Sequence, residues 1–155
     1  MPISISQTRR WNLKTRGISR AARKTLELEG AKEAEVAVLL TDDSTIQSMN
    51  RQHRGYDKPT DVLSFAQRDS GVGIPIPMQP EILGDVVVSV DTASRQAEVF
   101  GVPVENEIAL LVVHGILHLL GHDDETEDGA NQMRVREQRV LEAAGIGHHR
   151  MASEW

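Results

Sequence analysis

The sequence predicts an α+β fold in which about five helices pack on a small mixed four-stranded sheet. Segments with strand-like alternation are interleaved with segments of helical spacing, in the order β-α-β-α-β-β-α-α-α. A chain of 155 residues with 39% hydrophobic residues suits one compact core, and one helix is apolar on almost every side. We therefore expect residues 1–155 to form a single domain around that helix, with 144–155 as a flexible tail.

The first half of the chain predicts two strands and two helices. The stretch PISISQTR alternates with period two and predicts a short strand, whereas Leu13–Leu28 has helical spacing and stops at Gly30. Ala34–Thr41, with the sequence AEVAVLLT, predicts a buried strand. In DDSTIQSMNRQHRG, Asp or Ser residues cap a helix, whose one face carries Ile46, Met49, Asn50 and His53.

The second half predicts two further strands and three helices. TDVLSFAQ alternates in the manner of a strand, and GDVVVSVD is rich in β-branched residues. Between them, DSGVGIPIPMQPEILG contains enough Gly and Pro to predict a surface loop. We expect the helices at Asp91–Phe100, Pro103–Leu120 and about Glu127–Ala144.

Charge is distributed unevenly along the chain. The formal net charge of −6 argues against nonspecific binding to polyanions. Residues 1–26 nevertheless contain no acid, and they form either a basic face that guides a polyanion or an ordinary solvated helix face. Their basic residues are Arg9, Arg10, Lys14, Arg16, Arg20, Arg23 and Lys24.

Composition also predicts a soluble, cytoplasmic protein with no membrane partner. The longest apolar run, Ile108–Val113, is far too short to span a bilayer, and MPISISQTRRWN has no signal-peptide core. Cysteine is absent, so any metal must be held by imidazole and oxygen ligands.

The stretch VVHGILHLLGHDD places histidines inside the most apolar predicted helix. His114 and His118 are four residues apart, which puts both side chains on one face. A single buried histidine is usually a hydrogen-bonded core residue, but one metal ion can satisfy two at this spacing. Gly121 offers a left-handed turn that ends the helix. A third ligand can then come from the residues after the turn, which are His122, Asp123 and Asp124.

Three motifs in this chain resemble those of the YbeY family, which are bacterial rRNA maturation factors and metal-dependent endoribonucleases. HGILHLLGHDD resembles the family signature H-G-x-L-H-L-x-G-Y-D-H, and NRQHRGYDKPTDVLSFAQ resembles N-x-x-x-R-x-x-x-x-P-T-D-V-L-S-F. LGDVVVS, with the RQA that follows it, resembles the L-G-D-I motif region. The resemblance covers Ala34 to about Glu142 and agrees in motif order and spacing.

The resemblance implies one zinc ion per chain, held by His114, His118 and position 124. The chain departs from the family at His122, where Tyr is usual, and at Asp124, where His is usual. Asp124 can keep the ligand role as a carboxylate, which would favour harder metals such as Mn²⁺. The alternative third ligand is His122. Three protein ligands leave a fourth position open, as in catalytic sites.

The resemblance also assigns roles around the metal. His114 counts as catalytic as well as a ligand. Arg54 is catalytic and holds a substrate phosphate, unless it forms an ordinary surface salt bridge, and Lys58 in the same loop adds a phosphate contact. Gly115 occupies the position of the glutamate base in H-E-x-x-H proteases, which argues against a protease. The remaining candidates are expected to support the structure or to lie outside the catalytic site. They are Thr60, Asp61, Ser64, Gly84, Asp85, His53, Glu107, His148 and His149.

Four of these residues carry specific expectations. Asp85 would hold a loop or orient a ligand histidine. Glu107, roughly 10 Å from His114 along the helix axis, would touch substrate or face solvent. His53 would pack on its helix, and His148, like its neighbour, would lie at the surface.

These implications together predict a single-strand-specific, metal-dependent endoribonuclease. It would act in maturation of the 16S rRNA 3′ end and in ribosome quality control, with rRNA and the small ribosomal subunit, or a protein of it, as partners. The alternatives are a metal-containing ribosome-assembly factor that acts by binding, and a hydrolase of a non-RNA substrate. Because few aromatic residues are available for base stacking, recognition is expected to depend on phosphate and shape; they are Trp11, Tyr56, Phe65, Phe100 and Trp155.

Overall fold

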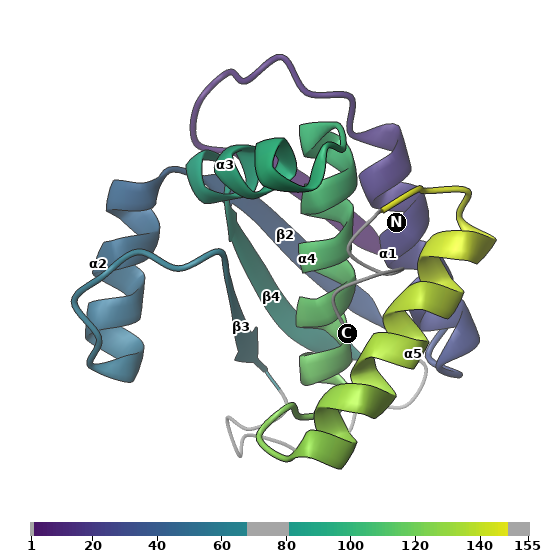
Figure 1. The fold of residues 1–155 in the computed structure, drawn as a ribbon. Helices are drawn as coiled ribbons and strands as arrows, with labels where there is room; N and C mark the ends of the chain where they lie inside the picture. The colour runs from purple at the N-terminus through teal and green to yellow at the C-terminus, as the bar shows by residue number, and fades with distance from the viewer. Residues whose placement is uncertain (1, 68–80, 149–155) are drawn as a thin grey trace.

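A computed structural model describes residues 2–67 and 81–148, and its strands and helices follow the predicted order (Figure 1). The prediction of an α+β fold with a four-stranded mixed sheet and five helices is confirmed. Most of the Gly- and Pro-rich stretch expected as a loop lies outside the described residues, and its end belongs to a strand. The elements are β1 (Ile3–Gln7), α1 (Arg16–Leu28), β2 (Glu35–Thr41), α2 (Asp43–Arg54), β3 (Val62–Ala66), β4 (Ile82–Ser89), α3 (Val90–Phe100), α4 (Val104–Leu119) and α5 (Glu127–Ala143).

The sheet has the strand order β1-β2-β4-β3, so that β3 is an edge strand. β1 and β4 run parallel to β2, and β3 pairs antiparallel with β4. Helix α2 covers one face of the sheet, while α1, α4 and α5 lie on the other side (Figure 1). β4 is buried on both faces, because Val86 and Val88 join the large core with α4 and Val87 joins the small core with α2. This explains the continuous apolar run of β4.

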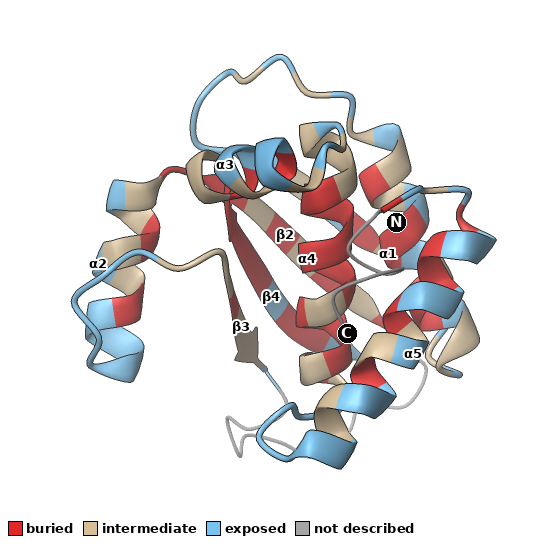
Figure 2. Cartoon of the chain, in the orientation of Figure 1, coloured by how far each residue is buried: buried red, intermediate tan, exposed pale blue. Residues whose placement is uncertain are grey.

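Helix α4 is the central element of the fold, as the sequence predicts. It contacts α1, α3, α5 and strands β3 and β4, and Figure 2 shows it buried along most of its length. Within the described residues, no single helix combines the length and apolar character needed to cross a bilayer; α3 and α4 do so only as a pair bent by 114°.

Gly115 allows α4 to lie directly against the sheet. A Cβ at this position would come within 2.6 Å of Val86 Cγ1 and 3.1 Å of Ser64 Oγ. The Ser64 hydroxyl donates a hydrogen bond to the Gly115 carbonyl at 3.0 Å. The residue beside His114 is therefore glycine for packing reasons, and the close approach holds His114 and His118 next to edge strand β3.

The segment after α5 packs on the N-terminal end of α4. Asn106 donates a hydrogen bond to the carbonyl of Gly147, and His148 Nε2 lies 2.5 Å from Glu107 Oε1. Both side chains of the His148–Glu107 pair are fully buried. The expectations that His148 is a surface residue and that Glu107 touches substrate or solvent are therefore wrong. Residues 144–148 of the expected tail are held in place, and 149–155 lie outside the described residues.

Candidate metal centre

The two histidines of α4 meet at the end of the helix, where the chain reverses. Their Nε2 atoms lie 3.1 Å apart. The helix ends at Leu119, and Gly121 adopts the left-handed conformation, with φ 101°. The amide of His122 then donates to the carbonyl of Leu117 at 3.0 Å, which closes the turn as the sequence predicts.

This turn brings Asp124, rather than His122, to the histidine pair. Asp124 Oδ2 lies 3.6 Å from His114 Nε2 and 3.8 Å from His118 Nε2. Ligand atoms of a tetrahedral zinc site with bonds near 2.1 Å are about 3.4 Å apart. The three separations are close to that value, and among the described residues this is the one group of three that could hold a metal ion. The donor set therefore fits a divalent ion.

His122 is directed elsewhere. Its Nε2 lies 2.8 Å from Glu29 Oε1, and Arg136 donates to the other oxygen of Glu29 at 2.7 Å. This network ties the turn after α4 to the end of α1 and to α5. His122 thus supports the position of the turn.

Glu137 of α5 orients His114 through the ring nitrogen that does not face the other candidate ligands. Its Oε1 accepts a hydrogen bond from His114 Nδ1 at 2.9 Å, and its side chain is only 1% exposed. With the proton on Nδ1, the lone pair of Nε2 faces Asp124 and His118, as in metal sites in which a carboxylate orients the ligand histidine. A signal was present in the sequence, because Glu137 lies on the apolar face of α5, four residues after Met133 and three before Val140.

The role of orienting a ligand histidine does not belong to Asp85. Asp85 is exposed and pairs with Phe65 across the β3–β4 ladder. Because side chains alternate along a strand, it points to the opposite face from Val86, which packs on α4. Asp85 therefore lies on the wrong side of the sheet to reach His114. Gly84 has a structural role, because it allows a close approach of two strands: a Cβ there would lie 2.1 Å from the Phe65 carbonyl oxygen.

The two histidines differ in their pKa shifts. Burial alone would lower the pKa of His114. The hydrogen bond and charge of Glu137, together with the charges of Asp124 and Asp61, outweigh burial and raise that pKa above the ordinary value. For His118, burial and the neighbouring His114 charge lower the pKa. His118 is therefore available as a neutral ligand near pH 7, whereas His114 must compete with a proton for a metal.

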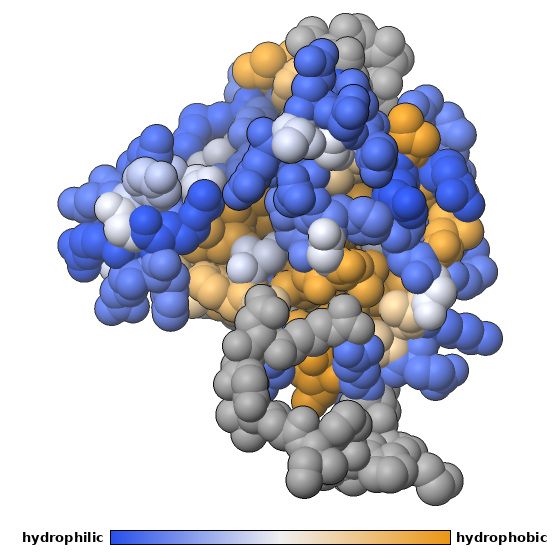
Figure 3. Space-filling view, turned by 90° about the horizontal axis from the view of Figure 1, so that it is seen from below, coloured by the Kyte–Doolittle hydropathy of each residue, from blue (hydrophilic) through white to orange (hydrophobic). Residues whose placement is uncertain are grey.

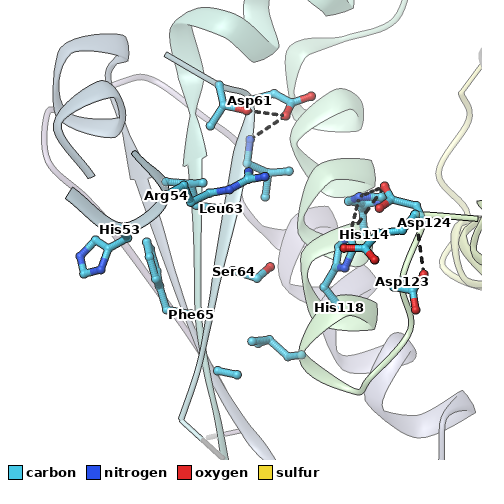
Figure 4. A pocket seen from close by; sticks show the side chains of 15 residues that line it. His53, Arg54, Asp61, Leu63, Ser64, Phe65, His114, His118, Asp123 and Asp124 are labelled. Atoms are coloured by element: carbon cyan, nitrogen blue, oxygen red, sulfur yellow. Dashed lines mark hydrogen bonds and ion pairs between the residues drawn. The ribbon is translucent and has the colours of Figure 1, made fainter. Parts of the chain in front are cut away.

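A pocket of about 650 Å³ lies in front of the three side chains (Figure 4). His114, His118 and Asp124 form one wall, and the end of α2 with edge strand β3 forms the other. In the view from below, apolar side chains gather in the hollow between the α2 side and the rest of the molecule (Figure 3). Arg54 lines this pocket, and so does His53, which the sequence does not place in the site.

The charged residues named by the sequence lie at the α2 side of the pocket. The guanidinium carbon of Arg54 lies 5.6 Å from the centre of the Tyr56 ring, and Lys58 Nζ lies 5.7 Å from it. Both cations thus lie near the Tyr56 ring, but Lys58 is not among the residues that line the pocket. Asp61 has a structural role, since its Oδ1 accepts from the amide of Val62 at 2.8 Å.

Comparison with known proteins places the chain in a family. The family model described as Endoribonuclease YbeY matches residues 3–145. The chain belongs to the YbeY family. Its relatives include the endoribonuclease YbeY of Moorella thermoacetica, 44% identical over 137 residues, with 86% of each chain covered. That of Pelotomaculum thermopropionicum is 47% identical over 127 residues, which cover 80% of this chain and 82% of the relative.

A solved structure agrees with the fold. The solution structure of TM1509 from Thermotoga maritima superposes with a TM-score of 0.60 at 25% identity, and the match covers 92% of this chain and 88% of that one. The resemblance to the YbeY family inferred from the motifs is therefore confirmed, and it extends nearly to both ends of the described chain.

In this member of the YbeY family, the pocket is acidic in the absence of a metal. Four carboxylates line it, and they face the single guanidinium of Arg54; they belong to Asp61, Asp123, Asp124 and Glu125. With neutral histidines, the formal charge of the lining residues is four negative charges against one positive, or −3. A phosphate would be repelled by such a lining unless a cation offset it.

Proposed function

We propose that the protein is a metal-dependent endoribonuclease that cuts single-stranded RNA during maturation of ribosomal RNA. The observation that carries the proposal is the His114–His118–Asp124 group, which faces Arg54 across one pocket in a YbeY family member. The acidic lining gives a physical reason for metal dependence, since Arg54 alone does not offset four carboxylates.

We assign the ligand role to His114, His118 and Asp124, with one ion per chain. A bound divalent ion supplies Lewis-acid chemistry to a phosphodiester. Two imidazoles and a carboxylate suit zinc, and the carboxylate in place of the family's usual histidine also admits a harder ion such as Mn²⁺. Glu137 supports this assignment, because it holds the proton of His114 at Nδ1 and leaves Nε2 directed toward the other two ligand side chains.

We assign the binding of a substrate phosphate to Arg54 and, as a second contact, to Lys58. The guanidinium fork of Arg54 matches two phosphate oxygens and stabilises charge that develops in the transition state. Among the described residues Arg54 has a cation–π contact with Tyr56 in place of a carboxylate partner, which leaves its N–H groups available to a ligand. A pocket of about 650 Å³ suits one or two nucleotides of a splayed strand, and this supports single-strand specificity.

The finer assignments rest on the motifs that resemble the family. We propose that the protein acts at the 3′ end of 16S rRNA and in ribosome quality control, in the cytoplasm, with the small ribosomal subunit or one of its proteins as partner. The basic N-terminal segment would guide RNA. Four of its basic side chains already have contacts within the chain. Arg9 pairs with Asp42, Arg20 donates to the carbonyl of Ala144, Arg23 donates to Ser19 and Lys24 pairs with Glu27. The guiding role therefore falls to the other basic residues of the segment.

The test is metal content measured beside RNA cleavage. We expect about one zinc or manganese per chain in the purified protein, lost together with cleavage of precursor rRNA in Asp124→Ala and His118→Ala. Asp128→Ala, which removes an exposed carboxylate on α5, is the matched control and should retain both. Asp124→His should keep the metal and shift the preference toward zinc.

Two results would contradict the proposal in different ways. Metal retained at the normal level in Asp124→Ala would exclude Asp124 as the third ligand. Equal ribosome binding by the metal-loaded and metal-free proteins, with no RNA cleaved by either, would favour the assembly factor that acts by binding.

A further inference from the structure

The wall of the pocket opposite the candidate ligands carries an aromatic pair. His53, near the end of α2, and Phe65, in β3, have ring centroids 4.9 Å apart and ring planes inclined by 63°. Both line the same pocket as His114 and His118 (Figure 4). His53 is exposed and Phe65 is partly exposed, so neither ring is fully covered by the chain.

Edge strand β3 lies between the aromatic pair and the candidate ligands. All five of its residues line the pocket. Ser64 points toward α4, where it bonds to Gly115, and Phe65 points to the other face, where it packs with the small core beneath α2. The pocket thus passes around an open strand edge, with the candidate ligands on one side and aromatic rings on the other. Arg54 reaches into the space between them (Figure 4).

Two of the five Phe, Trp and Tyr residues of the chain lie at this wall or near Arg54. Only 3% of the residues are Phe, Trp or Tyr. Phe65 lines the pocket, and Tyr56, 54% exposed, lies beside it under Arg54 and Lys58. Proteins hold single-stranded nucleic acids by stacking bases on aromatic rings and by binding phosphates with basic groups. The rings and cations around this pocket have that arrangement.

From this arrangement we infer that His53 and Phe65 form a nucleobase subsite. The base of a nucleotide next to the cut bond stacks on these rings, while its phosphate is held at Arg54. The inference rests on the proposed function and deepens it. Every base has an aromatic face, so the subsite accepts any base of a single strand and does not read sequence. Recognition then includes stacking, which the low aromatic content of the chain argued against.

The test compares an intact and an abasic substrate. The probe is a short single-stranded oligoribonucleotide with one site that the metal-loaded wild-type protein cuts, and the same oligonucleotide with one abasic nucleotide beside that site. On the intact RNA, His53→Ala should raise KM about fivefold to a hundredfold and change kcat little. On the abasic RNA, wild type and His53→Ala should have the same KM, because the stacking partner is absent from both.

Conservative variants separate stacking from folding and charge. His53→Phe keeps a ring without the imidazole and should retain the wild-type KM. Phe65→Leu keeps an apolar side chain for the core contacts and should behave as His53→Ala does. Gln52→Ala, on the same exposed turn of α2, is the control and should leave KM unchanged.

The outcomes distinguish this inference from the proposed function. If the wild-type protein cuts no RNA, the proposed function fails and the subsite fails with it. If it cuts the intact and abasic RNAs with equal KM, and His53→Ala and Phe65→Leu change neither, the protein is a ribonuclease without this subsite.

Discussion

The two ends of helix α4 each carry a histidine paired with a buried glutamate, yet the two pairs have different surroundings. At the N-terminal end, Glu107 and His148 are both fully buried. At the C-terminal end, Glu137 is 1% exposed, whereas His114 is 24% exposed and its Nε2 faces a pocket. The same chemical pair therefore stabilises the fold where it is sealed and can take part in chemistry where one ring nitrogen reaches a cavity.

The largest expected effect is on metal binding and RNA cleavage, which should depend on the C-terminal end of α4 and not on the N-terminal end. His118→Ala removes a ligand side chain at the pocket and should abolish metal binding and reduce RNA cleavage by more than about a hundredfold. His148→Ala, assayed at a temperature where it remains folded, should retain both. Metal analysis and cleavage rates, normalised to folded protein, check this. Similar losses in both variants would mean that the sealed pair also supports the site.

The second prediction concerns the free energy of unfolding, which should depend more on the buried N-terminal pair than on the histidine at the pocket. His148→Ala leaves the Glu107 carboxylate buried without this partner and should lower the free energy of unfolding by about 3–5 kcal/mol. His118→Ala, at a partly exposed position, should lower it by about 1 kcal/mol or less in the metal-free protein. Urea denaturation of the metal-free proteins measures both. A difference below about 1 kcal/mol would show that the buried pair contributes little.

A smaller effect is expected when the pocket pair is weakened but not removed. Glu137→Gln should reduce metal affinity by about 10- to 100-fold, because a glutamine orients His114 less firmly and makes it less basic. The pKa of His114 is raised by Glu137, so a proton displaces the metal at a higher pH than it would from a free imidazole.

The pH dependence gives this variant a second readout. Metal affinity of the wild-type protein should be complete above the raised pKa of His114 and fall as pH decreases through it. Glu137→Gln removes the largest cause that raises this pKa, so the fall should begin at a lower pH. Titration of metal binding between about pH 5 and 8 covers the ordinary range of histidine. An unchanged midpoint would contradict the role of Glu137.

The smallest effect concerns the turn that carries Asp124. His122→Phe removes the hydrogen bond to Glu29 and should cost about 1 kcal/mol of stability and weaken metal binding a few-fold. Burial alone would raise the pKa of Glu29, but its bonds to His122 and Arg136 lower it. The network therefore contributes above the ordinary pKa of Glu29 and is lost as pH falls through the lowered value. Thermal unfolding at pH 7 and pH 3 should show a larger difference between the variant and wild type at pH 7.

Local pattern was sufficient to predict much of the fold and the centre of the site. The helical spacing of His114 and His118, and the glycine at 121, are properties of a few neighbouring residues, and the structure reproduces both. Glu137 was missed as the residue that orients His114, although it lies on an apolar helix face. The sequence does not show that His53 lies at the pocket, because its own helix does not reveal which strand its ring meets.

What the sequence by itself determined is the set of elements, the burial of α4, the histidine pair and the family. Only the tertiary structure decided which of His122 and Asp124 faces the pair, which carboxylate orients His114, and that Glu107 is covered by residue 148. The physical reason is the separation along the chain over which each kind of interaction acts. Periodicity and turn preference act over a few residues, whereas these contacts join α4 or its turn to α1, to α5 and to the segment after it. They depend on how those elements pack around one helix.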